Sequence, residues 1–170
     1  LFDQSRCVAA GASDTAPALV ALDASMVIQN MSGERVVSAQ DFFVGPANNI
    51  ENTTILRPGD ILTAVRIPST WANADFYWEK VADRNVWDFS LVNVAAAFKV
   101  SGGQIQDSRI VVGAVQTTPR RLTDVENAIR GSARSAETAE SVKEMTTTGA
   151  RTLAHNGFKV PLMQNLVKRA

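Results

Sequence analysis

Two apolar runs separated by a pair of glycines constrain the fold of this chain more than any other feature of its sequence. The first run, residues 89–100, is rich in alanine and by composition alone could form a helix. It is followed by Ser101-Gly102-Gly103, which is typical of a hairpin turn, and then by the β-branched run Ile110-Val111-Val112. This order predicts a long antiparallel hairpin in place of a helix.

The patterns on both sides of this hairpin predict short elements. Before it, apolar alternation favours strands interrupted by short helices, and after Pro119 apolar residues recur at helical spacing. The predicted strands are residues 6–10, 25–30, 34–37, 60–67 and 76–81, and the predicted helices are residues 18–22, 39–43, 122–129, 136–145 and a final helix with Pro161 in its first turn.

A boundary between two domains is predicted near residue 70. Pro68 ends the preceding strand, and residues 68–74 are the best linker in the sequence. The chain is thereby divided into residues 1–69 and residues 70–170. In the second part strands come first and helices follow, which is the order of an α+β domain.

The composition argues against several classes of function. Seventeen Lys and Arg residues balance seventeen Asp and Glu residues, so nucleic-acid binding has no electrostatic footprint. No apolar run has the length of a membrane span. Cys7 lies in an apolar run and is expected to be a buried strand thiol. With one cysteine and one histidine, we expect no internal disulfide, no all-cysteine iron–sulfur site, no structural zinc site, and no Ser–His or Cys–His–acid catalytic set.

Three charged residues at four-residue spacing interrupt an aromatic stretch, residues 76–89. They are Lys80, Arg84 and Asp88. The spacing fits one face of a helix, whereas the aromatic and β-branched neighbours favour a strand, a loop and a second strand. In the second arrangement the three groups converge at the mouth of a hairpin. There they could form the edge of a site for a flat, polar-rimmed cofactor, or simply a solvated cluster of ion pairs.

Several further motifs carry a resemblance to a known family. They are residues 7–24, Phe42-Phe43, residues 56–68, the charged triplet, residues 112–115 and Pro119-Arg120-Arg121. With these segments in order, the chain resembles the C-terminal part of the FAD-binding (medium) subunit of the molybdenum hydroxylases, such as carbon monoxide dehydrogenase, xanthine dehydrogenase and aldehyde oxidoreductase. The resemblance implies the tail of a vanillyl-alcohol-oxidase-type (PCMH) FAD-binding domain, followed by an α+β flavoprotein C-terminal domain with an antiparallel sheet and helices.

The resemblance also implies which residues contact FAD. The aspartate of the Ser13-Asp14 motif contacts FAD in the family, although a plain helix cap, worth about 1 kcal/mol, is the alternative for this position. Lys80 matches the flavin-contacting lysine, whose charge would stabilise the reduced flavin. Leu62 matches a leucine that lines the ring pocket, and core packing is its alternative.

The loop residues complete the implied cofactor site. Arg84 and Asp88 match the rest of the family's pattern and are expected to pair with each other and hold the loop over the flavin. Trp78 is two residues before Lys80, where relatives carry an aromatic residue near the flavin, and buried packing is an equal alternative.

The resemblance implies a role in electron transfer. Substrate would react at a molybdopterin cofactor in a large subunit, and electrons would pass through [2Fe–2S] clusters in a small subunit to FAD and then to NAD, a quinone or dioxygen. The glycine-rich pyrophosphate loops would belong to a missing N-terminal half of the flavoprotein. A cytoplasmic location is expected, with export to the periplasm for some relatives. The alternative function is a non-catalytic docking domain.

Overall fold

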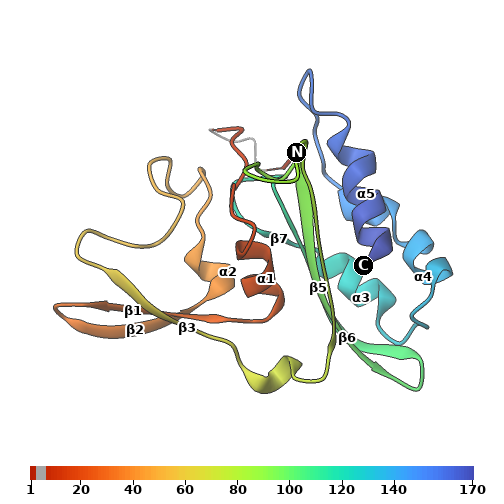
Figure 1. Ribbon diagram of the computed structural model, residues 1–170, viewed down its shortest axis with the longest axis horizontal. Helices are drawn as coiled ribbons and strands as arrows, with labels where there is room; N and C mark the ends of the chain where they lie inside the picture. The colour runs from red at the N-terminus through yellow and green to blue at the C-terminus, as the bar shows by residue number, and fades with distance from the viewer. Residues whose placement is uncertain (3–6) are drawn as a thin grey trace.

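Two antiparallel sheets and their flanking helices make up this computed structural model, which describes residues 1–2 and 7–170. The strand order is β2-β1-β3 in the first sheet and β4-β5-β6-β7 in the second (Figure 1). The strands are β1 Ser25–Asn30, β2 Gly33–Ser38, β3 Ile61–Arg66, β4 Asp75–Val81, β5 Val92–Ser101, β6 Gln104–Gly113 and β7 Arg120–Arg121. The helices are α1 Ala16–Ala21, α2 Ala39–Phe42, α3 Thr123–Ile129, α4 Ala136–Ser141 and α5 Lys159–Arg169, with 3-10 turns at Ser69–Trp71 and Glu144–Thr147.

The predicted long hairpin is confirmed as β5 and β6. Gly102 and Gly103 form its turn with φ values of 58° and 76°, a left-handed conformation that glycine adopts without strain. The alanines of β5 do not form a helix because β5 is a central strand buried on both faces. On one face Ala95 and Ala97 leave room for α1, and on the other the alternate residues meet α5 and the rest of the core.

The first sheet is held together at the start of β3. Asp60 accepts hydrogen bonds from Asn30 at 2.8 Å and from Arg35 at 2.6 and 3.0 Å, so one carboxylate ties all three strands. The hydrogen bond from Arg35, the backbone amide of Arg57 and the amide of Asn30 hold the pKa of the Asp60 carboxyl well below its usual range. The predicted strands of this sheet and the helical turn α2, capped by Ser38, are confirmed.

Helices α3, α4 and α5 lie on one side of the second sheet, and α1 lies on the other (Figure 1). The apolar stripe of α5 is confirmed, since Met163, Leu166 and Val167 are buried against the sheet. The helix predicted over 136–145 is shorter than expected, because α4 ends at Ser141 and a 3-10 turn follows. The α+β fold class is confirmed, with strands preceding helices.

The predicted strand over residues 6–10 is wrong where the structure can be compared. Residue 6 lies outside the described residues, and residues 7–10 form no strand. They lie along the loop after β6 instead, where the amide of Gly11 donates to the carbonyl of Gln116 at 2.8 Å. Cys7 is consequently half-buried and is not the buried strand thiol that its apolar neighbours suggested.

No helix within residues 1–2 and 7–170 combines the length and apolarity needed to cross a lipid bilayer.

Candidate functional site

An ion pair joins the start of α1 to the end of β4. The ammonium group of Lys80 lies 2.6 Å from Oδ2 of Asp14, and it also donates to the backbone carbonyl of Asp88 at 2.6 Å. The two side chains are 23% and 35% exposed, so the pair lies at the surface but is partly shielded from water. The helical alternative for the charged triplet is wrong, because Lys80 belongs to a strand and the other two residues belong to the loop that follows it.

Two residues that the sequence analysis did not select complete the surroundings of Asp14. Ser90 donates to Oδ1 of Asp14 at 2.6 Å, and Asn93 donates to the Ser90 hydroxyl at 2.9 Å and to Asp14 at 3.4 Å. Asn93 is 1% exposed and is the cross-strand partner of Lys80. A single polar residue inside an apolar central strand was the signal that could have identified Asn93.

These contacts keep Asp14 ionised. Partial burial raises the pKa of its carboxyl, but the hydrogen bonds from Lys80 and Ser90 and the charge of Lys80 outweigh it. The pKa therefore lies below its ordinary value. At neutral pH the carboxylate compensates the ammonium of Lys80 and leaves both groups in fixed positions.

Capping of the helix is not the role of Asp14. The amide of Ala16 donates to the hydroxyl of Ser13 at 3.1 Å, so Ser13 provides the side-chain acceptor at the start of α1. The carboxylate of Asp14 is left to the polar cluster formed with Lys80, Ser90 and Asn93.

Arg84 and Asp88 pair with each other, as the sequence predicted. Their side chains are 3.9 Å apart, and the carboxylate of Asp88 also accepts the backbone amides of Arg84 and Phe89, both at 3.0 Å. Arg84 in turn donates to the carbonyl of Trp87 at 3.0 Å. One carboxylate thus organises the loop between β4 and β5, and the same loop offers the Asp88 carbonyl to Lys80.

An aromatic-walled hollow lies on the same face of β4 as Lys80. Phe76 and Trp78 are 58% and 51% exposed. Together with Lys80 they occupy every second position of β4, so the three side chains lie on one face of the strand. The hollow has a volume of about 290 Å³, and alanines of α1 and β5 form its floor. Trp78 is therefore a wall residue and is not buried in the core, which was its alternative role.

Leu62 is not brought together with these residues. It lies on β3 in the other sheet, is 37% exposed, and is not among the described residues that line the hollow beside Trp78. Core packing, its alternative role, is not seen either, because every residue of β3 is exposed.

The arrangement suits a flat aromatic group with electron-rich atoms at one edge. Aromatic side chains and alanines line the hollow, and Lys80 is the next residue after Trp78 on the same face of β4. An ammonium has three hydrogens, and the described residues supply partners for two of those of Lys80, so one remains for an acceptor of a ligand. The residues present therefore fit a flavin.

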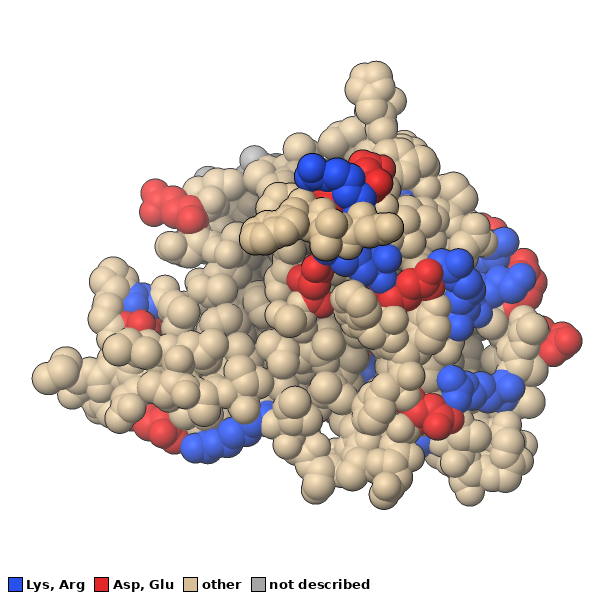
Figure 2. All heavy atoms as spheres, in the orientation of Figure 1, with Lys and Arg blue, Asp and Glu red and all other residues tan. Residues whose placement is uncertain are grey.

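Figure 2 shows how charge is distributed over one side of the molecule. Acidic and basic side chains are dense in the centre and on the right of the view, over the second sheet and its helices, and sparser on the left, over the first sheet. Exposed apolar side chains such as Ile61, Val65, Phe76 and Trp78 lie on β3 and β4.

Two family models match almost the whole chain. The model described as the CO dehydrogenase flavoprotein C-terminal domain matches residues 78–170, and the model described as the FAD binding domain in molybdopterin dehydrogenase matches residues 5–70.

Curated relatives and solved structures give the same result. The nicotine 6-hydroxylase medium subunit of Paenarthrobacter nicotinovorans is 32% identical over 161 residues, which cover 89% of this chain and 52% of the relative. The aldehyde oxidoreductase FAD-binding subunit PaoB of Escherichia coli is 30% identical, with coverage of 92% and 46%. The chain thus spans about half the length of these relatives.

The fold is also found in crystal structures. A chain of quinoline 2-oxidoreductase from Pseudomonas putida 86 superposes with a TM-score of 0.79 at 27% identity, over 95% of this chain and 56% of that one. Carbon monoxide dehydrogenase from Hydrogenophaga pseudoflava superposes with a TM-score of 0.81 at 24% identity, over 94% and 55% of the two chains, which establishes a shared fold.

Proposed function

Because the chain belongs to the family of FAD-binding medium subunits of the molybdenum hydroxylases, we propose that it forms one wall of an FAD site and serves in electron transfer. The observation that carries the proposal is the ion pair of Lys80 and Asp14 beside the hollow of Phe76 and Trp78. The pair joins groups from the two regions that the family models match, and Lys80 shares its face of β4 with Phe76 and Trp78.

Bound FAD supplies the two-electron redox chemistry of its flavin, and the chain's own residues bind and tune it. Lys80 offers its remaining hydrogen and its positive charge to the electron-rich edge of the ring. Asp14 fixes the ammonium and limits its net charge. Ser13, Trp78 and Leu62 are proposed to line the cofactor site, with Leu62 at a more remote part of it than Lys80.

The loop between β4 and β5 supports this arrangement. Asp88 holds Arg84 through its carboxylate and Lys80 through its carbonyl, so loop order and lysine position are linked. Arg84 and Asp88 are therefore proposed to organise the loop near the cofactor and not to exchange protons with it.

The larger assembly is proposed from the relatives. Their medium subunits are about twice as long as this chain, which supports an N-terminal half that completes the FAD site. A molybdopterin-binding large subunit and a [2Fe–2S] small subunit would deliver electrons to FAD, and an external acceptor would remove them. The names of the relatives, which include medium chains and FAD-binding subunits, support an oxidoreductase subunit of this kind.

Flavin content tests the proposal. We expect the 170-residue chain alone to bind no FAD, and the same chain joined to an N-terminal half of a relative to bind about one FAD per protein. Lys80→Ala and Asp14→Ala in the joined protein should each lower the bound flavin, measured by absorbance after gel filtration. The matched control is Lys168→Ala, which removes a lysine from an ion pair of the same 2.6 Å length on the helical side.

The docking function is the alternative outcome. If the joined protein binds FAD and both site variants retain it fully, Lys80 and Asp14 are not cofactor ligands. A non-catalytic docking domain would then be the better account of this chain. The exposed Trp87 and Phe89 at the tip of the loop are the observation that favours it.

A further inference from the structure

Helix α1 is fastened to the second sheet at both of its ends. Before its first residue, Asp14 binds Lys80 and Ser90 of the β4–β5 region. After its last turn, Asp23 accepts a hydrogen bond from Nε of Arg109 on β6 at 3.1 Å. Two carboxylates on either side of one short helix thus bond to separate places on the same sheet.

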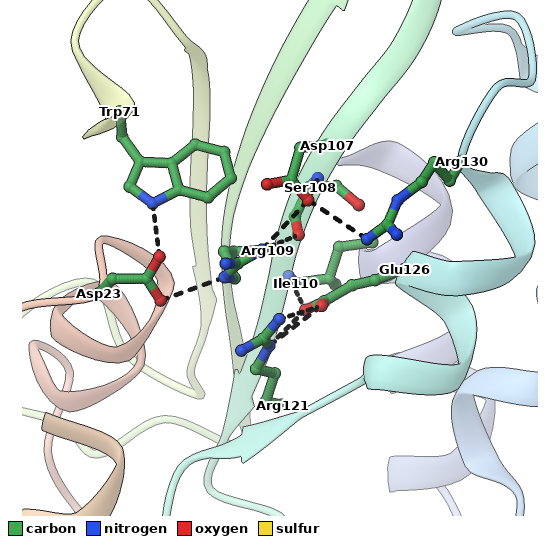
Figure 3. A network of polar contacts seen from close by, with 9 residues as sticks. All are labelled: Asp23, Trp71, Asp107, Ser108, Arg109, Ile110, Arg121, Glu126 and Arg130. Carbon is green, nitrogen blue, oxygen red and sulfur yellow. Dashed lines mark hydrogen bonds and ion pairs between the residues drawn. The ribbon is translucent and has the colours of Figure 1, made fainter. Parts of the chain in front are cut away.

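A buried tryptophan completes the second attachment. Trp71, in the 3-10 turn that connects the two sheets, donates its indole N–H to Asp23 at 2.8 Å and is only 1% exposed (Figure 3). Two cations also lie over its ring in cation–π contacts: the ammonium of Lys99 is 4.8 Å and the guanidinium of Arg109 is 4.9 Å from the ring centroid. Asp23, Trp71 and Arg109 together are called the distal clamp below.

Other residues of the second sheet hold Arg109 of the distal clamp in place. Arg109 donates to the carboxylate of Asp107 at 3.2 Å and to the carbonyl of Ser108 at 2.9 Å. Arg130, just after α3, approaches the same carboxylate at 3.5 Å. Figure 3 shows these groups in sequence from Trp71 to Arg130. The guanidinium of Arg109 therefore has a fixed position from which to hold Asp23.

Helix α1 depends on such attachments for its position. It has six residues, about 9 Å of helix at 1.5 Å per residue, and a helix this short is not stable by itself. Its buried side chains, such as Val20 and Ala21, meet small residues of the sheet, Ala95 and Val111.

We propose that the distal clamp is a positioning device for the cofactor site: it fixes the end of α1 remote from Asp14 and so keeps the Asp14 carboxylate against Lys80. This inference rests on the proposed FAD function of Lys80. If the clamp is weakened, Asp14 moves from the ammonium more often, and more positive charge faces the flavin. A greater positive charge favours the reduced flavin, so the midpoint potential rises.

The test uses the joined protein with bound FAD and two mild substitutions. Asp23→Asn is nearly isosteric, but Trp71 and Arg109 donate to different oxygens of Asp23, and the amide keeps only one acceptor oxygen at these two positions. Trp71→Phe keeps a ring for the two cations and removes the N–H. We expect each to raise the two-electron midpoint potential by about 30 mV, a tenfold change in the equilibrium constant. Trp71→Phe leaves a cavity and should lower the unfolding temperature, so unchanged FAD content at a temperature well below unfolding would show that the effect is not general unfolding.

A double-variant comparison isolates the coupling. Asp14→Asn should raise the potential by at least as much as Asp23→Asn, and the combination should equal Asp14→Asn alone, since the clamp acts through Asp14. The matched control Glu140→Gln, which weakens an exposed ion pair on α4, should leave the potential unchanged. A second measurement needs no FAD: the pKa of Asp14 by NMR should rise toward its ordinary value in both clamp variants.

Different failures have different meanings. If Asp14→Asn shifts the potential while Asp23→Asn and Trp71→Phe do not, or if the shifts of Asp14→Asn and Asp23→Asn simply add, the positioning role is wrong and the FAD function is unaffected. If the joined protein holds no FAD, or if Lys80→Ala and Asp14→Asn leave both flavin content and potential unchanged, the proposed function fails instead.

Discussion

At the scale of single residues, Gly113 controls the position of Asn93 and through it the contacts of Asp14. A β-carbon on Gly113 would lie 2.1 Å from Oδ1 of Asn93 and 2.7 Å from the ring of Pro17. We expect Gly113→Ala to push Asn93 away from Ser90 and to lower the free energy of unfolding by about 1–3 kcal/mol. Urea denaturation of the chain measures this change.

The control for Gly113 is Gly157→Ala, because a β-carbon at residue 157 has open space. If Gly113→Ala were as stable as this control, Asn93 could move aside without cost. The hydrogen bonds from Asn93 would then be unimportant for the site.

The contribution of Asp14 to stability should depend on pH. Its folded-state pKa is below its ordinary value, so the stabilisation is fully present above the unfolded value of about 4 and disappears as the pH falls through the lower, folded value. The difference in unfolding free energy between the wild type and Asp14→Asn should therefore be constant near pH 7 and shrink below about pH 4. A difference that grew toward acid pH would contradict the ion pair with Lys80.

The sequence predicted part of this site for identifiable reasons. Lys80 and Asp14 stand in motifs that can be matched along the chain, and the structure brings them together. Ser90 and Asn93 were not selected. The polar Asn93 within an apolar strand was a usable signal, but its position opposite Lys80 depends on the cross-strand register, which the sequence does not show. Leu62 matched a motif equally well but lies on a different sheet from Lys80.

At the scale of secondary-structure elements, local signals predicted strands and helices where turn residues delimit them. The glycine pair after β5 correctly predicted a hairpin turn, although the alanines of β5 favour a helix. Ser38 correctly marked the start of α2. Residues 7–10 were predicted wrongly because, among the described residues, this apolar run lies against the loop of Gln116 and Thr117 and not against a strand. The end of α4 was missed because no strong stop signal follows Ser141.

Helix α3 is attached to the second sheet by one buried carboxylate. Glu126 is 2% exposed and accepts hydrogen bonds from the guanidinium of Arg121 on β7, the shortest at 2.7 Å, and from the amide of Ile110 on β6 at 2.9 Å. We expect Glu126→Gln to lower the free energy of unfolding by about 3 kcal/mol, since Arg121 would remain partly buried without its counter-charge.

Chemical denaturation measures the effect of Glu126→Gln, with Glu140→Gln as the control. Glu140 also pairs with a cation, but its side chain is 51% exposed, and exposed ion pairs contribute little. Equal midpoints for the two variants would mean that the buried pair of α3 contributes no more than a surface pair.

At the scale of the whole molecule, residues of both sheets contribute to one apolar cluster. Helix α1 precedes the first sheet in sequence and yet packs on β5 and β6 of the second, and Ala95 and Val111 belong to the same apolar cluster as Met26 of β1. The domain boundary near residue 70 stays a prediction, and the contacts of α1 with β5 and β6 cross it.

The ion pair of Asp14 and Lys80 joins positions that are 66 residues apart, and the bond of Asp23 to Arg109 spans 86. In a chimaera of two parental flavoproteins joined near residue 70, both contacts would link a segment of one parent to a segment of the other. Such a hybrid would combine the carboxylates of one parent with the cations of the other, and one mismatch would misplace α1 even if each parental segment folded correctly. Gene shuffling within this family should therefore recover the two segments together far more often than separately.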